Sequence, residues 1–165
     1  MKNNFETGLS IRKAEEKDIP GILSLLSQVL EIHAEIRPDI FVSGTTKYGR
    51  DELCSIINGE KTPVFVAVNE NSGVIGYAFC IIREQPSNEN LVQFKYLYID
   101  DLCVDGKYRG MSIGKQLFEY AKNFAKELGC YEITLNVWRG NNPAEKFYEK
   151  NGFKPQKTYM EYILE

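Results

Sequence analysis

The sequence has 165 residues, of which 43% are hydrophobic, which is typical of one globular domain spanning residues 1–165. Lys and Arg number 20 against 23 Asp and Glu, and this net charge of −3 argues against nucleic-acid binding, which usually needs a broad basic face. No apolar run approaches the roughly 20 residues that span a bilayer, and no signal-peptide pattern is present, so we expect a cytoplasmic protein without membrane contact. The four cysteines form no C-x-x-C pair and there is one histidine, which disfavours a zinc site or a disulfide framework.

The first half of the chain is predicted to contain helices and short strands. Asp18 is expected to cap a helix with Pro20 in its first turn, and apolar residues recur at helical spacing over 19–30. The segment 31–49 is predicted to be irregular. The other elements expected here are a strand at 9–14, a helix at 50–58 and a hairpin with strands at 64–68 and 74–82.

The second half is predicted to form strands and helices around a glycine-containing turn. A polar loop at 83–90 precedes a long strand at 92–104, and the segment YRGMSIGK then leads into a helix at 113–128 that Gly129 ends. The order of elements predicts an α/β fold with a mostly antiparallel sheet and one βαβ crossover. The remaining elements are a strand at 133–137, a short helix at 143–150 and a terminal strand at 157–164.

The junction from Asp101 to Gln116 has the features of a phosphate-binding turn. Gly110 and Gly114 let the backbone approach a ligand closely, and the start of the helix directs free N–H groups and a positive dipole end at an anion. Three cations lie here without an intervening carboxylate, although an ordinary loop and helix cap would show the same glycines. The cations are Lys107, Arg109 and Lys115.

Two well-known phosphate loops do not fit this junction. A P-loop has four residues between its glycines and then Lys followed by Ser or Thr, whereas three residues separate Gly110 from Gly114 and Gln116 follows Lys115. The dinucleotide fingerprint G-x-G-x-x-G is also absent. We therefore expect phosphate binding without a metal.

Two motifs resemble the GNAT acetyltransferase superfamily. The family signature R/Q-x-x-G-x-G/A resembles residues 109–114, except that Ser112 stands where glycine is usual. The family's C-terminal motif N-x-x-A-x-x-[LF]-Y-E-K-x-G-F resembles residues 141–153. The resemblance covers about Ile11 to Ile163 and implies a mixed, mostly antiparallel sheet of about six to seven strands with about four helices, splayed between the fourth and fifth strands.

The resemblance implies an N-acetyltransferase that uses acetyl-CoA as co-substrate, with no metal. The pantetheine arm is expected to pair with the backbone of the fourth strand, as a peptide adds to a sheet edge. Asn141 matches the family asparagine that contacts the cofactor arm. The backbone groups facing the arm are expected to belong to Leu102, Cys103 and Val104, and the pyrophosphate cradle to Arg109, Gly110, Ser112, Ile113, Gly114 and Lys115.

Three side chains are candidates for the chemistry. Tyr148 matches the family tyrosine near the thioester sulfur and would protonate the leaving thiolate, the alternative being a packing aromatic. Asp100 is ranked first, and Asp101 second, as the group that removes a proton from the amine. Strand alternation would place the two aspartate side chains on opposite faces of the sheet, but the family commonly has a bulge in this strand, which would change that alternation. For both aspartates the alternative role is local capping or pairing. Cys103 is expected to be a buried core thiol.

The acceptor is expected to be a primary amine of a small molecule or peptide. Its walls are predicted to come from 31–49, 83–90 and the C-terminal strand. His33 lies in the first of these regions, where a structural role is the default and contact with the substrate is the alternative. A homodimer is compatible with the family. A non-catalytic acyl-CoA-binding module is the alternative function. Carboxylates that would favour a cationic amine are Glu31, Glu35, Asp39, Glu84 and Glu89.

Overall fold

The computed structural model describes residues 8–71 and 73–164. In this part of the chain five strands form one sheet in the order β1-β2-β3-β4-β5. Neighbouring strands are antiparallel except β4 and β5, which are parallel. The strands are β1 (Leu9–Lys13), β2 (Val64–Asn69), β3 (Gly73–Glu84), β4 (Lys95–Val104) and β5 (Glu132–Leu135).

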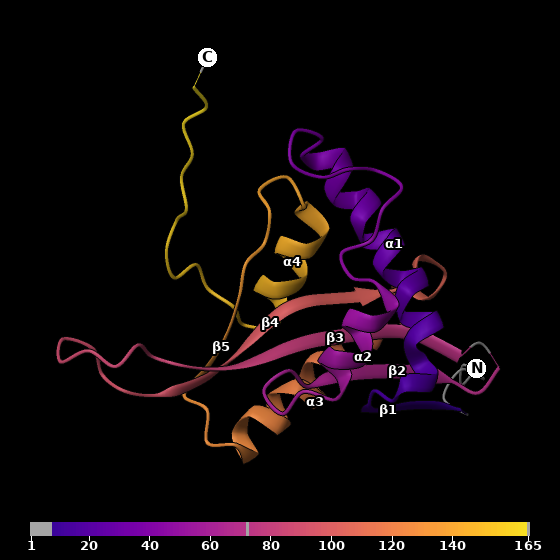
Figure 1. Cartoon of the computed structure of the whole chain (residues 1–165), viewed down its shortest axis with the longest axis horizontal. Helices are drawn as coiled ribbons and strands as arrows, with labels where there is room; N and C mark the ends of the chain where they lie inside the picture. Colours follow the sequence, from indigo (N-terminus) through magenta and orange to yellow (C-terminus); the bar gives the residue numbers. More distant parts are fainter. Residues whose placement is uncertain (1–7, 72, 165) are drawn as a thin grey trace.

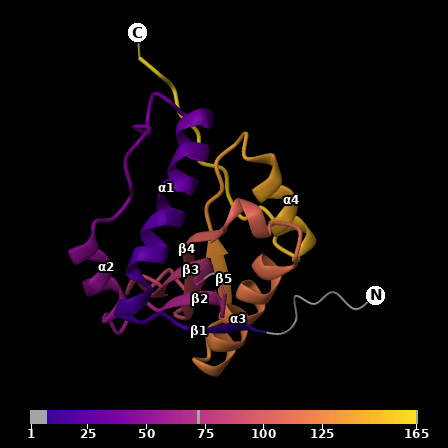
Figure 2. The same cartoon turned by 90° about the vertical axis from the view of Figure 1, so that its right-hand side faces the viewer.

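Four α-helices cover the two faces of this sheet. α1 and α2 lie on one face and α3 and α4 on the other (Figures 1 and 2). Two short 3-10 helices, at 16–18 and 106–108, precede α1 and α3. The α-helices are α1 (Ile19–Ile36), α2 (Arg50–Ile57), α3 (Ile113–Glu127) and α4 (Asn142–Lys150).

The predicted α/β architecture is confirmed, with differences in the strands. The predicted six to seven strands are not matched, since five are present in the described residues. The chain at 157–164, predicted as a terminal strand, forms no strand there. The central strands also shift: β3 continues to Glu84, β4 begins at Lys95 rather than 92, and β5 ends at Leu135 rather than 137.

α1 is longer than its sequence pattern predicted. It continues to Ile36, so the first part of the segment expected to be irregular is helical. Asp18 stands at the N-cap position, but its carboxylate accepts both bonds of the Arg12 guanidinium, at 2.7 and 2.9 Å, instead of capping the helix. The start of α1 is thus fixed to β1 by a buried ion pair.

The segment Glu16–Ile36 is long and apolar enough to cross a membrane by length and composition, so the statement that no such run exists is wrong. In the fold, however, the apolar stripe of α1 faces the sheet. Ile22, Leu25 and Leu26 are fully buried among side chains of β2 and β3. A core helix of a folded domain meets the same length criterion.

Candidate active site

A β-bulge in β4 brings two carboxylates to one face of the sheet. Phe79 of β3 pairs with Asp101 and the next residue, Cys80, pairs with Ile99, so Asp100 is the extra residue on β4. Ile99 faces α3, whereas the side chains of Asp100 and Asp101 both contact residues on the α1 face. The bulge expected in this strand is therefore confirmed, and it places the two aspartates side by side rather than on opposite faces.

Asp100 is held by two donors from the segment before α2. Its carboxylate accepts hydrogen bonds from Lys47 Nζ at 2.6 Å and from Tyr48 Oη at 2.9 Å. Burial alone would lower the pKa of Lys47, but the contact with Asp100 outweighs it and raises that pKa, so the ammonium stays charged. Asp100 is thus the ion-pair partner of Lys47.

Asp101 has a different environment. The Asp101 carboxylate accepts a hydrogen bond, at 2.7 Å, from the hydroxyl of the fully buried Tyr77. Burial raises the pKa of Asp101 to about 6, against the opposing effects of the Tyr77 bond and the Lys47 charge. A carboxylate with a pKa close to neutrality suits a general base better than one with an ordinary value.

Tyr148 lies on α4, a helix whose start is fixed by Asn141. The Asn141 side chain accepts from Ala144 N at 3.4 Å and so caps α4, in agreement with the preference of asparagine for this position. The Tyr148 ring packs edge-on against Phe147 and Phe153.

The Tyr148 hydroxyl is kept neutral by its surroundings. Burial, and next the nearby Asp101 carboxylate, raise the pKa of Tyr148. The phenol therefore remains a proton donor at neutral pH. Its neighbour on α4, Phe147, packs at Gly114, and Val104 at the end of β4 lies beside the same glycine. Burial also raises the pKa of Cys103 to about 12, so this thiol stays protonated and fits the expected core role.

β4 and β5 separate halfway along β4. Their pairing extends from Tyr96 to Ile99, and in the described residues β5 supplies no partner beyond that point. The last residues of β4 pair with β3 on one side only, so the backbone groups of their other edge are available. The three residues expected to face the pantetheine arm, Leu102, Cys103 and Val104, lie on this open edge.

The turn between β4 and α3 has left-handed backbone conformations at two places. Gly110 has φ +81°, and an added Cβ there would meet open space, so conformation rather than crowding requires the glycine. Ser112 has φ +61°, and among the residues that the structure describes it is the only non-glycine residue with a positive φ. Gln116 N donates to Ser112 O, which leaves the amides of the first helical turn without intrahelical partners.

Gly114 is needed for packing between two helices. A Cβ at Gly114 would lie 3.3 Å from the Phe147 ring of α4 and 3.6 Å from Val104. The glycine therefore lets α4, which carries Tyr148, approach the start of α3. Its expected place in the cradle is compatible with this second role, because Ile113 and Gly114 also present the first amides of the helix.

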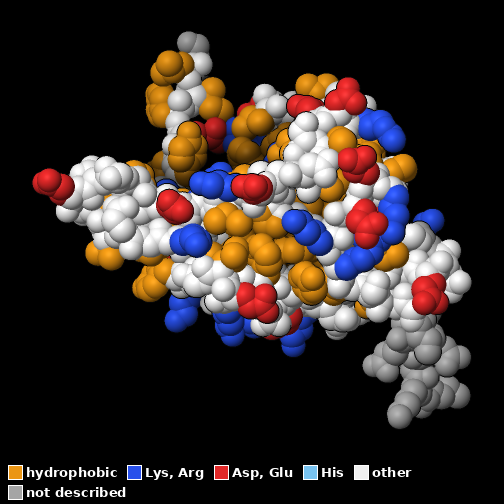
Figure 3. Space-filling view, turned by 60° about the horizontal axis from the view of Figure 1, so that its bottom comes forward, with side chains coloured by type: hydrophobic (Ala, Val, Ile, Leu, Met, Phe, Trp, Pro, Cys, Tyr) orange, Lys and Arg blue, Asp and Glu red, His pale blue; other side chains and the backbone are white. Residues whose placement is uncertain are grey.

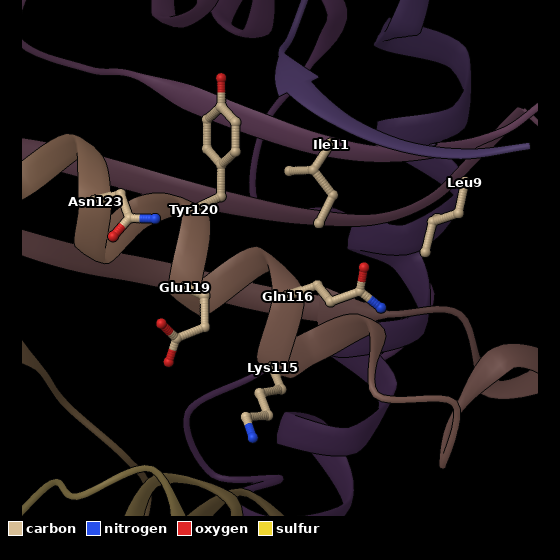
Figure 4. Close-up of a pocket in the computed structure, with 7 residues that line it drawn as sticks. All are labelled: Leu9, Ile11, Lys115, Gln116, Glu119, Tyr120 and Asn123. Atoms are coloured by element: carbon tan, nitrogen blue, oxygen red, sulfur yellow. The ribbon is translucent and has the colours of Figure 1, made fainter. Parts of the chain in front are cut away.

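The basic side chains of the turn differ in direction. Arg109 Nε donates to Val104 O at 3.3 Å, which holds its guanidinium beside the open edge of β4. Lys115 instead lines a shallow groove of about 400 Å³ between β1 and α3 (Figure 4). Of the cradle residues, Lys115 is thus placed to contribute its backbone amide rather than its ammonium group. The groove is lined by Leu9, Ile11, Lys115, Gln116, Glu119, Tyr120 and Asn123.

Residues that the sequence interpretation did not select complete the site. Lys47, Tyr48 and Tyr77 are the direct partners of the two aspartates. Tyr77 lies in a predicted strand, where a buried tyrosine needs a partner for its hydroxyl, and this was the available signal. Lys47 and Tyr48 lie in a segment without periodicity, so only the tertiary fold reveals their role.

Aromatic side chains gather at the end of α1, in the region expected to wall the acceptor site. The His33 ring lies 5.1 Å from Phe41, which packs edge-on against Trp138 at 5.4 Å. Burial lowers the pKa of His33. Two of the carboxylates expected to attract a cation are already engaged, since Asp39 pairs with Arg37 and Glu31 accepts from Ser43 and Gly44.

Comparisons with known proteins agree with this geometry. The model of the acetyltransferase (GNAT) family matches residues 26–153. A protein from Bacillus halodurans, solved as a mutant, is 34% identical with a TM-score of 0.90 over 94% of this chain and 99% of that one. Glucosamine 6-phosphate N-acetyltransferase from Arabidopsis thaliana is 28% identical over 91% of this chain and 93% of its own.

A solved aminoglycoside acetyltransferase from an uncultured soil metagenomic sample is 25% identical, with a TM-score of 0.72 and full coverage of both chains. The family match, the named relatives and the arrangement of the site agree with one another. The chain therefore belongs to the acetyltransferase (GNAT) family and is an N-acetyltransferase enzyme.

Proposed function

We propose that the protein moves the acetyl group of acetyl-CoA to a primary amine by direct attack in a ternary complex. The observation that carries the proposal is the bulge in β4, which presents Asp100 and Asp101 together at the start of the open strand edge. α4, which carries Tyr148, packs near the end of β4, since Phe147 and Val104 both lie next to Gly114. A proton acceptor for the amine and a proton donor for the leaving thiolate thus meet at one point.

The chain fits acetyl-CoA in two places. The open edge of β4 at 102–104 offers backbone groups to the amides of a pantetheine arm, and the free amides at the start of α3 suit a pyrophosphate. In this proposal Arg109 and the amides from Gly110 to Lys115 hold the pyrophosphate, and Asn141 Nδ2 contacts the arm. The proposal includes no metal.

Asp101, rather than Asp100, is proposed as the base. The Asp101 carboxylate has the raised pKa and a single hydroxyl donor, while Asp100 is neutralised by Lys47. Asp101 would take the proton from the attacking ammonium group, directly or through one water. The ion pair between Asp100 and Lys47 would hold in place the wall of the acceptor site beside Asp101.

Tyr148 is proposed to complete the reaction. When bound, acetyl-CoA supplies the acetyl group as a thioester. As the C–N bond forms and the C–S bond breaks, Tyr148 would donate its hydroxyl proton to the leaving sulfur. The nitrogen loses its second proton to solvent as the addition product collapses, and the proton held by Asp101 restores the phenol through solvent. The overall reaction of an ammonium substrate thus yields the amide, the free thiol of CoA and one released proton.

The acceptor is proposed to be a small polar amine. Arg83 lies over the Tyr98 ring at 4.0 Å and Asn136 Nδ2 donates to Tyr98 Oη at 3.2 Å, two residues before Asp100 on the same face of β4. This group lies about 7 Å along the strand from Asp100. A sugar-sized acceptor could place its amine at Asp101 and its hydroxyl or anionic groups here, which fits the amino sugar of the Arabidopsis relative's name.

Thiol release from acetyl-CoA, followed across a panel of amines with mass detection of the acetylated product, tests this function. The panel would contain glucosamine 6-phosphate, an aminoglycoside, a polyamine and a short peptide, and we expect the amino sugar to be acetylated fastest.

Tyr148→Phe should lower kcat by about 10- to 1000-fold because the proton donor is lost, while binding of CoA changes little.

Tyr131→Phe is the matched control, because Tyr131 is 75% exposed and packs beside Phe94, away from the open edge. It should behave like the parent enzyme. Undiminished turnover of Tyr148→Phe, measured where acetyl transfer limits the rate, would show that Tyr148 only packs. CoA binding without release of thiol toward any amine in the panel would contradict the transfer itself.

A further inference from the structure

Arg83, near the end of β3, is a cation that the rest of the described chain leaves unpaired. Its guanidinium lies over the Tyr98 ring, at 4.0 Å from the ring centroid. Among residues 8–71 and 73–164 it forms no hydrogen bond and no ion pair. Contact with an aromatic face holds a guanidinium in place without using its five N–H donors. The donors of Arg83 are therefore available to a ligand.

This guanidinium lies on the same face of the sheet as the two aspartates. Ile99 belongs to the core beneath α3, so strand alternation turns its neighbour Tyr98 toward α1. Arg83 reaches over that ring from the adjacent strand. Because Asp100 is the bulged residue, the side chains of Asp100 and Asp101 also lie on the α1 side. An acceptor whose amine is at Asp101 can thus extend along β4 toward the guanidinium.

The Tyr98 ring is itself fixed by the strand on its other side. Asn136, the residue after β5, donates through Nδ2 to Tyr98 Oη at 3.2 Å. Among the described residues the Tyr98 hydroxyl donates to no group, so its proton is free to point at the same ligand as the guanidinium. The pair offers a planar fork of N–H groups and one O–H group. Such a set suits the three terminal oxygens of a phosphate.

The carboxylates around this face are engaged by other groups or lie far from the guanidinium. Lys47 neutralises Asp100, the aspartate nearer to Tyr98 along the strand. Arg37 bonds to Asp39 in the segment after α1. Glu132 lies two strands across the register, about 10 Å away, which is too far for an ion pair with Arg83. The unpaired charge at this end of the face is therefore positive.

We propose that Arg83 is the specificity-determining residue of the acceptor site and binds a phosphate carried by the amine substrate. The inference rests on the acetyl-transfer function proposed above and names the class of its acceptor. Tyr98 and Asp100 are separated by about 7 Å along β4, so the amine and the phosphate must lie about one sugar ring apart. This class differs from the cationic amine that the acidic residues of the sequence favoured.

A comparison of glucosamine 6-phosphate with glucosamine tests the role of Arg83, because the two amines differ only in the phosphate. The parent enzyme should favour the phosphorylated sugar by roughly 10- to 100-fold in kcat/KM, mainly through KM, since the bonds to the phosphate form on binding. Arg83→Gln should remove most of that preference. Arg83→Lys keeps the charge but loses the fork, so its preference should be intermediate.

Two controls separate a phosphate contact from general charge and from spacing. Lys126→Gln removes one exposed positive charge from α3, on the other side of the sheet, and should keep the parent preference. The surface on that side carries positive and negative side chains interspersed (Figure 3). Phosphoethanolamine holds its amine and phosphate closer together than the sugar does, so its kcat/KM should be low and should not depend on Arg83.

Calorimetric binding of glucosamine 6-phosphate to the protein saturated with CoA measures the same contact without turnover. Arg83→Gln should weaken this binding roughly tenfold or more, whereas Lys126→Gln should not change it. Equal kcat/KM for the two sugars, or a preference that survives Arg83→Gln, overturns the inference and leaves acetyl transfer intact. A phosphoethanolamine rate above that of the phosphorylated sugar contradicts the spacing. If no amine is acetylated, acetyl transfer itself is contradicted, and the calorimetric comparison still decides whether Arg83 binds the phosphate.

Discussion

At the scale of single residues, Ser112 shows where this chain departs from its family and at what energetic cost. A non-glycine residue in the left-handed region costs roughly 1–2 kcal/mol. The Ser112 side chain makes no capping bond that offsets this cost, and the position is the one where the family usually has glycine. The serine therefore keeps the turn but strains it.

Ser112→Gly should raise the free energy of unfolding by about 0.5–1 kcal/mol. This value is the backbone strain that is relieved in the folded state minus the cost of the greater conformational entropy that glycine gives the unfolded chain. Binding of CoA should be equal or tighter, since the turn is already in the required conformation. Urea unfolding and calorimetric titration measure the two quantities. Gly110→Ser, which creates the same strain at φ +81°, is the reciprocal control and should destabilise. A less stable Ser112→Gly protein would mean that the serine hydroxyl stabilises the turn.

The sequence located both aspartates and favoured Asp100, whereas the proposal made from the structure favours Asp101. Asp100 was preferred for its place in the strand, yet the fold pairs it with Lys47 and gives Asp101 the raised pKa. The difference arises from Lys47, which lies more than fifty positions away along the chain. No pattern within β4 carries that information.

At the scale of elements, the contact between α3 and α4 couples the proposed pyrophosphate-binding turn to Tyr148, the proposed proton donor. Gly114→Val would place its side chain against the Phe147 ring, next to Tyr148. Overpacking of this kind costs about 1–3 kcal/mol, and it would shift α4 away from β4. We expect CoA binding to weaken roughly tenfold and kcat to fall as well, because both the turn and Tyr148 move.

A compensating substitution separates crowding from loss of a ligand contact. Gly114→Val combined with Phe147→Ala should recover part of kcat and stability if the helices were merely too close. Titration with CoA and steady-state kinetics on the single and double variants measure the coupling. Independent, additive effects of the two changes would contradict a shared contact between α3 and α4.

Elements with strong periodicity were predicted closely, and those that depend on a distant partner were not. α3 was predicted within one residue because its buried stripe and Gly129 fix both ends. The end of α1 was missed because no glycine or proline marks it between Leu30 and Arg37. The segment 157–164 has a strand pattern but no partner strand in the described chain, so its pattern alone overstated the number of strands.

At the scale of the whole molecule, the proposed function depends on where the sheet is incomplete. β4 and β5 diverge after Ile99, which leaves the strand edge that we propose binds acetyl-CoA, and among the described residues β5 pairs on one side only. The family motifs predicted the divergence of β4 and β5. Neither open edge is visible in composition or charge.

The pH dependence of kcat/KM for the amine tests most directly whether Asp101 is the base. A carboxylate with pKa about 6 accepts a proton only above that pH, so the parent rate should rise through pH 6 and then level off while the amine is protonated. Asp101→Asn should be slower by about 10- to 1000-fold near neutral pH and should keep rising with pH, because only free amine then reacts. Asp100→Asn should retain the rise near pH 6. A profile in which Asp101→Asn keeps that rise and Asp100→Asn loses it would contradict the account.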